Sequence, residues 1–318
     1  MSLGWLFSFN IIGKMGNKYF DIQVNGYGGV DYNQNDLTLK DLRLSCLKLK
    51  DDGVEGIFAT IITADFQDMI LRIKNLVYLR EQDALIHEII KGIHIEGPFL
   101  NNADGYRGAH PKEHILKPNV AQLKELLDAT DGLCRIFTLA PENDINNQLI
   151  KYLHSQGIII SAGHCNPNLE ELKSAIDAGL SMFTHLGNGC PQTLPRHDNI
   201  IQRALSLKDD LKICFIADGI HIPFYALKNY IKIAGIENCV VTTDAMAAAG
   251  AKAGRYTISN IELEVGEDRI VREPGKPNFA GSAIDMPSSA LNLKTEIGLS
   301  EKEITQLTYS NPIRLFKN

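Results

Sequence analysis

The sequence predicts an α/β protein with a single architecture, a (β/α)8 barrel of the TIM type. The chain has 318 residues, a length within the usual range of that fold. Between residues 19 and 244, eight apolar runs rich in β-branched residues alternate with amphipathic stretches. Polar residues recur at or just after the carboxyl ends of these runs, and in such a barrel those ends converge on the mouth where active sites lie.

The expected strands are apolar throughout instead of alternating with polar residues. Such runs are typical of parallel strands covered on both faces, because neither face of the sheet meets water. The eight expected strands span residues 19–24, 54–63, 91–96, 134–140, 157–162, 180–185, 212–218 and 239–244.

The stretches between these runs place apolar residues at three- and four-residue intervals, which predicts helices with one buried face. They span residues 37–49, 65–80, 120–129, 144–155, 168–178, 200–207 and 223–234. After the eighth strand, short alternation predicts a β-hairpin near 256–271, inserted in the last loop of the barrel. A helix over 287–293 follows, and a last helix begins after Ser300, an N-cap whose capping box Glu303 completes.

The sequence contains no linker, low-complexity tract or internal repeat that would mark a second domain. Residues 20–318 are expected to form the catalytic barrel, and residues 1–19 an N-terminal arm. The arm is apolar, but it lacks the basic segment and the small-residue cleavage site of a signal peptide.

Composition argues against several kinds of partner. The formal net charge of −6 does not suit nucleic acid or an acidic membrane surface. No run of about 18 apolar residues predicts a transmembrane helix. None of the six cysteines is in a CxxC pair, and several lie inside apolar runs, which favours buried free thiols and a cytoplasmic setting.

Three residues at strand ends suggest a metal site. Glu96 ends the third expected strand and is followed at once by Gly97-Pro98, so its carboxylate needs an arginine, a lysine or a metal ion nearby. His164 and His185 fall at the ends of the fifth and sixth runs. Two imidazoles and a carboxylate with one open position suit a catalytic zinc-type site. The alternatives are a loop histidine bonded to backbone for His164 and a satisfied core histidine for His185.

Asp244, at the end of the eighth expected strand, is the candidate general base. A carboxylate beside a metal site can accept the proton of an activated water, and the eighth strand lies next to the first in a closed barrel. The alternative is an N-cap aspartate that opens the following loop.

These residues carry a specific resemblance, which extends in order from about Phe20 to Pro312. The motifs resemble those of N-acetylglucosamine-6-phosphate deacetylases, which belong to the amidohydrolase superfamily of metal-dependent barrel hydrolases. They are residues 20–30, 94–99, 108–110, 161–164, 184–188, 217–221, 243–245 and 280–283.

The resemblance implies a role for each residue of the reacting centre. Glu96, His164 and His185 would hold one divalent metal ion, and Asp244 would act as the general acid and base. Zn²⁺ suits this ligand set, and Fe²⁺ or Mn²⁺ also fit it. His110 would orient or polarise the amide carbonyl.

The resemblance also implies which residues support the centre. Many amidohydrolases bind a second metal through His-x-His at the first strand, where this chain has Gln23-Val24-Asn25. Neutral amides are poor metal ligands, so one metal is expected, with Gln23, Asn25 and His94 as supporting groups.

Substrate contacts and assembly follow from the same resemblance. Asn188, the backbone at Gly189, Arg196 and His221 would contact sugar hydroxyls and phosphate. In the family a phosphate-binding arginine reaches across a dimer interface, so a homodimer is implied; the alternative for Arg196 is a solvated loop arginine. The family's small β-sandwich domain is expected to be largely absent, because only 19 residues precede Phe20.

The predicted function is metal-dependent hydrolysis of the acetamide of N-acetylglucosamine 6-phosphate to glucosamine 6-phosphate and acetate. One alternative is the same chemistry on an unphosphorylated sugar or another N-acyl compound. A further alternative is an inactive barrel that serves as a binding protein.

Overall fold

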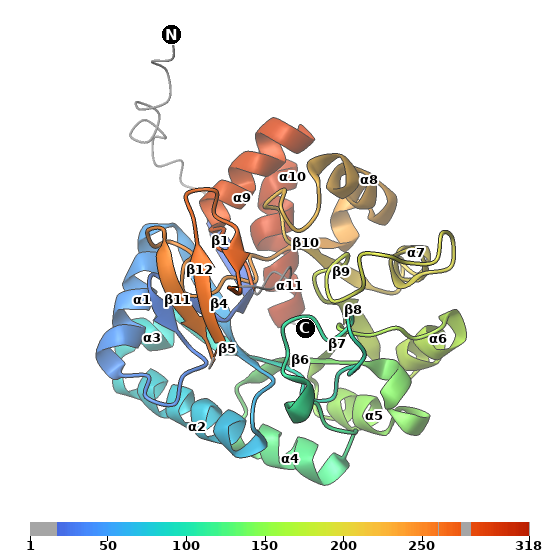
Figure 1. Ribbon diagram of the computed structural model, residues 1–318, viewed down its shortest axis with the longest axis horizontal. Coiled ribbons are helices and arrows are strands. Elements are labelled where there is room, and N and C mark those ends of the chain that lie inside the picture. The colour runs from blue at the N-terminus through green and yellow to red at the C-terminus, as the bar shows by residue number, and fades with distance from the viewer. Residues whose placement is uncertain (1–17, 260, 275–280, 318) are drawn as a thin grey trace.

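In the computed structural model, eight parallel strands form one curved sheet with helices around its outside (Figure 1). The structure describes residues 18–259, 261–274 and 281–317, so all but the last two residues of the expected N-terminal arm lie outside the described residues. Each strand pairs with the next along the chain. They are β1 (Tyr19–Val24), β4 (Val54–Ile62), β5 (Ile90–Glu96), β6 (Cys134–Leu139), β7 (Ile159–Ala162), β8 (Leu180–Phe183), β9 (Lys212–Phe215) and β10 (Cys239–Val241). The predicted (β/α)8 barrel is confirmed.

Side chains close the seam between the last barrel strand and the first. Val24 forms a parallel bridge with Ala245. The buried Asp21 carboxylate of β1 accepts hydrogen bonds from the hydroxyls of Thr242 and Thr243, both at 2.5 Å. Burial raises the pKa of Asp21 to about 6. The seam therefore depends on a polar cluster that lies between the two strands.

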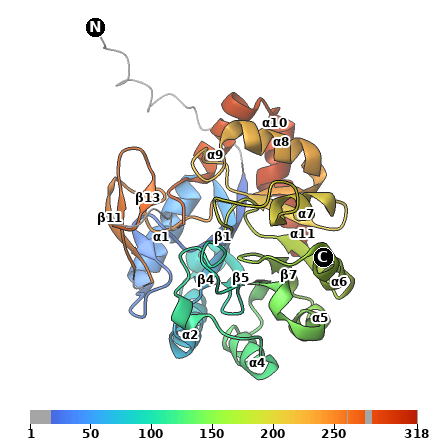
Figure 2. The ribbon, with the colours of Figure 1, turned by 45° about the vertical axis from the view of Figure 1, so that its right-hand side comes forward.

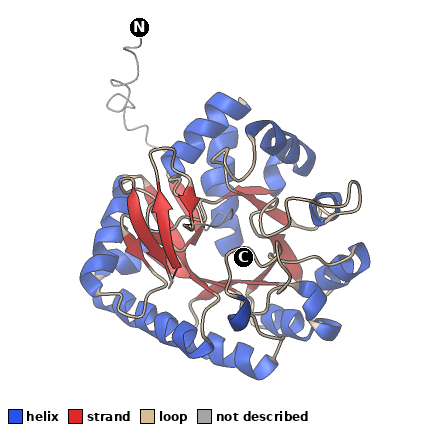
Figure 3. Ribbon diagram, in the orientation of Figure 1, coloured by secondary structure: helices blue, strands red, loops and turns tan. Residues whose placement is uncertain are grey.

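The helices form an outer ring around the strands, which is clearest in Figure 3. The α-helices are α1 (Leu39–Asp51), α2 (Phe66–Gln82), α3 (Ala84–Ile89), α4 (Val120–Ala129), α5 (Gln148–Ser155), α6 (Leu169–Asp177), α7 (Ile200–Ser206), α8 (Phe224–Ala234), α9 (Met286–Asn292), α10 (Glu301–Thr305) and α11 (Asn311–Lys317). The 3-10 turns are η1 (Lys112–His114), η2 (Pro141–Asn143), η3 (Ile145–Asn147) and η4 (Ile236–Asn238), and two π-helical turns are η5 (Leu293–Ile297) and η6 (Gln306–Ser310).

The helix boundaries follow local capping. Ser300 and Glu303 form the expected capping box at the start of α10. The helix expected over 144–155 begins only at Gln148, because Asn146 and Asn147 have left-handed backbone with φ of 58° and 55°. Among the described residues, none of the helices combines the length and apolar character needed to cross a membrane.

The lower half of the barrel is filled by apolar side chains. Phe20, Phe58, Ile136, Met182 and others, from six of the eight barrel strands, form one buried cluster, and residues of η6 and α11 pack against it. The apolar lower half leaves the carboxyl ends of the strands as the polar end of the barrel.

A small antiparallel sheet covers one side of that polar end. It consists of β11 (Gly254–Ile258), β12 (Ile261–Val265) and β13 (Val271–Arg272), so the stretch in which a hairpin is expected carries three strands. Its inner face packs on Ile62 at the end of β4 and on residues 246–248. Figure 1 shows it over β1 and β4, and in the turned view of Figure 2 it lies at the left of the molecule, by α1. A two-stranded ribbon, β2 (Gly26–Tyr27) and β3 (Val30–Asp31), follows β1.

Candidate active site

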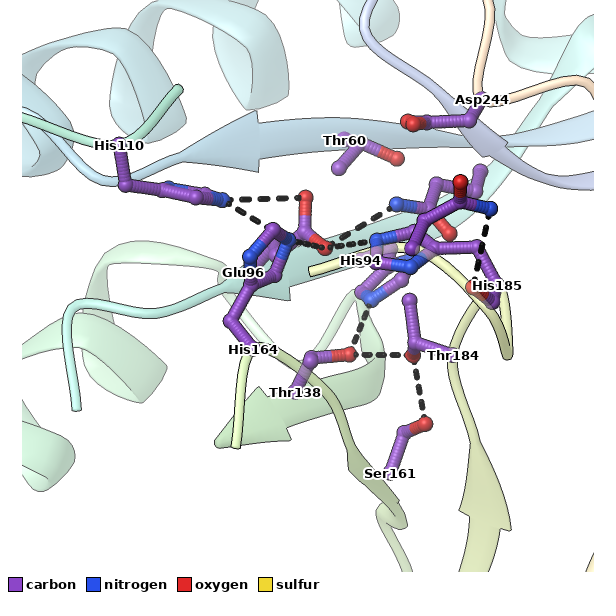
Figure 4. Close-up of polar contacts among 12 residues, drawn as sticks. Thr60, His94, Glu96, His110, Thr138, Ser161, His164, Thr184, His185 and Asp244 are labelled. Atoms are coloured by element: carbon purple, nitrogen blue, oxygen red, sulfur yellow. Dashed lines mark hydrogen bonds and ion pairs between the residues drawn. The ribbon is translucent and has the colours of Figure 1, made fainter. Parts of the chain in front are cut away.

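Glu96, His164 and His185 converge at the mouth of the barrel. Glu96 is the last residue of β5, and the two histidines each follow the end of a strand, β7 and β8, by two residues. The ligand atoms of the three residues lie within 4.8 Å of one another, and all three residues are buried. Oε1 of Glu96 is 3.0 Å from Nε2 of His185 and 3.4 Å from Nε2 of His164 (Figure 4).

The backbone at the mouth adopts an uncommon conformation. His164, His185 and Asp244 have positive φ, at 49°, 31° and 50°. Such a conformation costs of order 1–3 kcal/mol for a residue with a side chain, and it persists only where surrounding contacts enforce it. This conformation turns the chain just after each strand ends and directs the three side chains to the mouth of the barrel. Strands far apart in the sequence thereby contribute residues to one site.

The His164 ring lies between two glycines. A Cβ at Gly108 would lie 2.9 Å from Cε1 of His164, and one at Gly189 would lie 2.8 Å from its Nδ1, so both positions require glycine for space as well as for their positive φ. Nδ1 of His164 is 2.9 Å from the carbonyl oxygen of Tyr106. Because a carbonyl only accepts, Nδ1 carries a proton, and whenever the ring is neutral Nε2 presents its lone pair to the cluster.

The donor set fits a bound cation. With its proton on Nδ1, a neutral His164 has an acceptor at Nε2, and this atom faces the Glu96 carboxylate, which is also an acceptor. Nε2 of His110 also lies close to this atom, 3.3 Å from Nε2 of His164. A divalent cation held by Glu96, His164 and His185 would satisfy the lone pairs that face one another there, and a carboxylate with two imidazoles matches a catalytic zinc-type ligand set.

The electrostatics of the cluster centre on Glu96. Burial raises the pKa of Glu96, but hydrogen bonds and charge from His164 and His185 outweigh burial and hold it well below its usual range. Burial lowers the pKa of His185, while the hydrogen bond to Glu96 more than offsets this and leaves it raised. Burial, with the nearby charge of His164, lowers the pKa of His110 to about 3. His110 is therefore a neutral imidazole at ordinary pH.

Asp244 and the two amides of β1 and its loop complete the centre. Nδ2 of Asn25 donates to Oδ1 of Asp244 at 2.7 Å, and Nε2 of Gln23 donates to Oε1 of Glu96 at 3.2 Å. Burial raises the pKa of Asp244 to about 6, against the lowering effect of the His185 charge. The two expected supporting amides thus orient the two carboxylates of the site.

His94 lies below the cluster and anchors a chain of buried hydroxyls. Nδ1 of His94 faces the carbonyl oxygen of Ile22 at 3.1 Å, so Nδ1 donates and Nε2 accepts from the Thr138 hydroxyl at 2.7 Å. Thr138 must then accept from Thr184 at 2.9 Å, and Thr184 from Ser161 at 2.6 Å. Burial lowers the pKa of His94 to about 4, so the ring stays neutral. Figure 4 shows this hydroxyl chain, which sequence reasoning missed, beside the cluster.

The centre opens into a cavity of about 410 Å³, within the range typical of small-molecule sites. Asn188, Gly189 and His221, which the sequence predicts as contacts for the sugar and its phosphate, line this cavity. Asp218 holds His221 through an Nδ1 to Oδ2 contact of 2.6 Å. Arg196 is exposed and is not part of the lining within this chain.

Metal-dependent hydrolases with this barrel typically have two imidazoles and a carboxylate at the mouth, and a further carboxylate across from them. The fold and the site therefore define this chain as a member of that class. No protein-family model matches the chain. The chain is 30% identical over 292 residues to an N-acetylglucosamine-6-phosphate deacetylase of Bacillus subtilis, covering 91% of this chain and 72% of that protein. It is 32% identical over 301 residues to an N-acetylgalactosamine-6-phosphate deacetylase of a Shewanella species, covering 92% and 72%.

Solved structures agree with these relatives. An N-acetylglucosamine-6-phosphate deacetylase of Pasteurella multocida superposes with a TM-score of 0.84 at 27% identity, covering 95% of this chain and 76% of that one. A Mycobacterium smegmatis deacetylase in complex with N-acetyl-D-glucosamine-6-phosphate gives 0.85 at 25% identity, with coverage of 95% and 77%. The chain therefore belongs to the N-acetylglucosamine-6-phosphate deacetylase family, hydrolytic enzymes of the amidohydrolase superfamily, as its motifs indicate. Membership of this superfamily implies a divalent metal ion, which the cluster of Glu96, His164 and His185 has the ligands to bind.

Proposed function

We propose that this protein hydrolyses the acetamide of N-acetylglucosamine 6-phosphate, giving glucosamine 6-phosphate and acetate. The observation that carries the proposal is the convergence of Glu96, His164 and His185 beside Asp244 and His110 in one cavity. The relatives and solved structures named above support the same substrate class. The three ligands would hold one divalent ion; Zn²⁺ suits two imidazoles and a carboxylate, and Fe²⁺ or Mn²⁺ also fit.

Held by Glu96, His164 and His185, a divalent cation would supply Lewis-acid chemistry to the acetamide carbonyl and to the attacking water at neutral pH. Asp244 accepts a proton from the attacking water as the new C–O bond forms. His110, which is neutral, donates an N–H to the oxygen on which negative charge develops. Asp244 then returns the proton to the nitrogen as the C–N bond breaks, so the amine leaves as a neutral group, and the acetic acid that forms with it loses its proton to water and becomes acetate.

The sugar and its phosphate would lie against the residues that follow β8 and β9. Asn188, the backbone at Gly189 and His221 line the cavity on that side and offer donors to hydroxyls and phosphate oxygens. We propose that Arg196 binds the phosphate in the partner subunit of a homodimer, since within its own chain it is exposed and outside the cavity.

The setting and the division of the chain complete the proposal. All six cysteines are free and five of them are buried, which suits a reducing, cytoplasmic compartment. Residues 20–318 would form the catalytic unit and residues 1–19 its N-terminal arm. Tyr19 is already the first residue of β1.

An acetate-release assay over a panel of N-acetylated sugars tests the proposal. We expect N-acetylglucosamine 6-phosphate to give the highest kcat/KM, well above unphosphorylated N-acetylglucosamine. The 4-epimer, N-acetylgalactosamine 6-phosphate, is a second candidate, because a relative with that activity is 32% identical to the chain. Equal rates with and without phosphate would contradict the phosphate assignment, and no release from any member would favour an inactive binding protein.

A further inference from the structure

One side of the active-site cavity is apolar, while the rest of its lining is polar or glycine-rich apart from Cys190 and Pro191. Four residues form this apolar wall: Ile62, Ala109, Ile258 and Ile261. Ile62 and Ile258 belong to one buried cluster, and the other two pack against it, so the wall is continuous. Its members come from the end of β4, from the loop that carries His110, and from the tip of the sheet that follows β10.

The wall lies across the barrel from the proposed sugar-binding residues. In the strand order, β4 is second and β8 is sixth of eight, so the ends of these strands are diametrically opposed. Asn188 and Gly189 follow β8, whereas Ile62 ends β4. Glu96, His164 and His185, at or just after the ends of β5, β7 and β8, line the same cavity as both sides.

An amide bound at this centre has two substituents to place. The nitrogen, which carries the sugar, and the acyl carbon chain diverge from the carbonyl carbon within the planar amide group. When the sugar lies toward Asn188, the acyl chain points toward the apolar wall. Apolar groups that lose contact with water gain about 25 cal/mol per Å² of buried surface, and no polar group in the wall would compete for that place.

The wall is held in position from outside the cavity. Nη1 of Arg72, on α2, donates to Oγ of Ser259 at 2.8 Å, and Nε of the same side chain donates to Oδ1 of Asn35 at 2.7 Å. The Arg72 side chain is completely buried. Ser259 immediately follows Ile258, so this arginine fixes the tip of the sheet against the body of the barrel.

We propose that the wall of Ile62, Ala109, Ile258 and Ile261 binds the acyl substituent of the substrate and restricts it to a short chain such as acetyl. This inference rests on the proposed function, because it assigns the acyl end of the same substrate. Wild-type kcat/KM is expected to fall by about 10- to 200-fold for each added carbon that the wall excludes.

The test compares N-formyl, N-acetyl, N-propionyl and N-butyryl glucosamine 6-phosphate as substrates of the metal-loaded wild type and of Ile258→Ala. The substitution removes three carbons from the wall, so the preference for acetyl over propionyl should drop by about tenfold or more in kcat/KM. Ile258→Val, a smaller change, should lower the same preference less and provides a variant that folds if the alanine variant does not.

Leu263→Ala is the matched control, since Leu263 lies on the same strand and inner face as Ile261, belongs to the same cluster, and does not line the cavity. The proposal requires an unchanged acyl preference in this control. An acyl preference that stays at the wild-type value in both Ile258 variants, or that shifts equally in Leu263→Ala, would overturn it. A wild type that hydrolyses no member of the series would instead overturn the proposed function, together with the inference built on it.

Discussion

Replacing Asp244 with asparagine removes the proposed proton acceptor while keeping its place in the structure. Oδ1 of the native side chain accepts from Nδ2 of Asn25 at 2.7 Å, and an asparagine oxygen can accept the same bond. The substitution should therefore leave the side chain in its native position while it abolishes proton transfer. Loss of a general base lowers kcat by about 100- to 10,000-fold. That range corresponds to about 2.7–5.5 kcal/mol of transition-state stabilisation.

The assay for this prediction is acetate release under saturating substrate, on protein whose metal content is measured. KM should change little, because proton transfer occurs in the transition state, and the bound metal should stay, because Asp244 is not part of the ligand cluster. Asp144→Asn serves as a control, since Asp144 is a buried carboxylate that accepts from two amides of α5, outside the cavity. A kcat for Asp244→Asn within about tenfold of the wild type, at equal metal content, would refute the reasoning.

Three further predictions follow from the site and its surroundings. In a pH–rate profile, kcat/KM should fall on the acid side at or below about pH 6, because burial raises the pKa of Asp244 to about 6 and a bound cation moves it lower. Gln23→Leu should weaken metal binding by about 10- to 100-fold in a competition with a chelator, because it removes the amide that donates to Oε1 of Glu96 and orients this carboxylate. Burial raises the pKa of Asp31 to about 7, so the folded state binds this proton more tightly than the unfolded chain does. As pH falls from about 8 to 4, the free energy of unfolding of the wild type should therefore rise by on the order of 3 kcal/mol relative to that of Asp31→Asn. Urea denaturation of the two apoproteins at each pH measures this difference.

The strands could be located from sequence because parallel strands covered on both faces are continuous apolar runs. The errors lie at the carboxyl ends. The strands expected over 180–185 and 239–244 end at Phe183 and Val241. His185 and Asp244 lie beyond those ends in left-handed backbone, a conformation that tertiary contacts impose and that no pattern of apolar residues reveals.

Glu96, His164, His185 and Asp244 could be picked out because each lies at or just after the end of a strand, whereas His110 was indicated only by the family resemblance; the structure brings Glu96, His164 and His185 together. The chain of hydroxyls beneath them could not be identified from the sequence. Thr138 and Ser161 stand inside apolar runs, where a hydroxyl looks like any small strand residue. Only the register, which sets Glu96 beside Thr138 and Thr138 beside Ser161, shows that they lie at one level of the barrel.

The apolar wall escaped sequence reasoning for a related reason. Ile258 and Ile261 belong to a short sheet inserted after the eighth strand, and nothing in their neighbourhood marks them as facing a cavity. They reach the site because the sheet folds back over β4 and because Arg72, nearly 190 residues earlier in the chain, holds its tip.

In the proposed function, hydrolysis depends on one divalent ion held by Glu96, His164 and His185. The most direct measurement is the metal-to-protein ratio and the rate of acetate release, determined on the same samples of wild type and Glu96→Gln. We predict one tightly bound divalent ion per chain in the wild type, loss of most of that ion in Glu96→Gln, and acetate release that falls in proportion. A wild type that releases acetate without a bound metal, or a Glu96→Gln variant that keeps both metal and activity, would contradict the account.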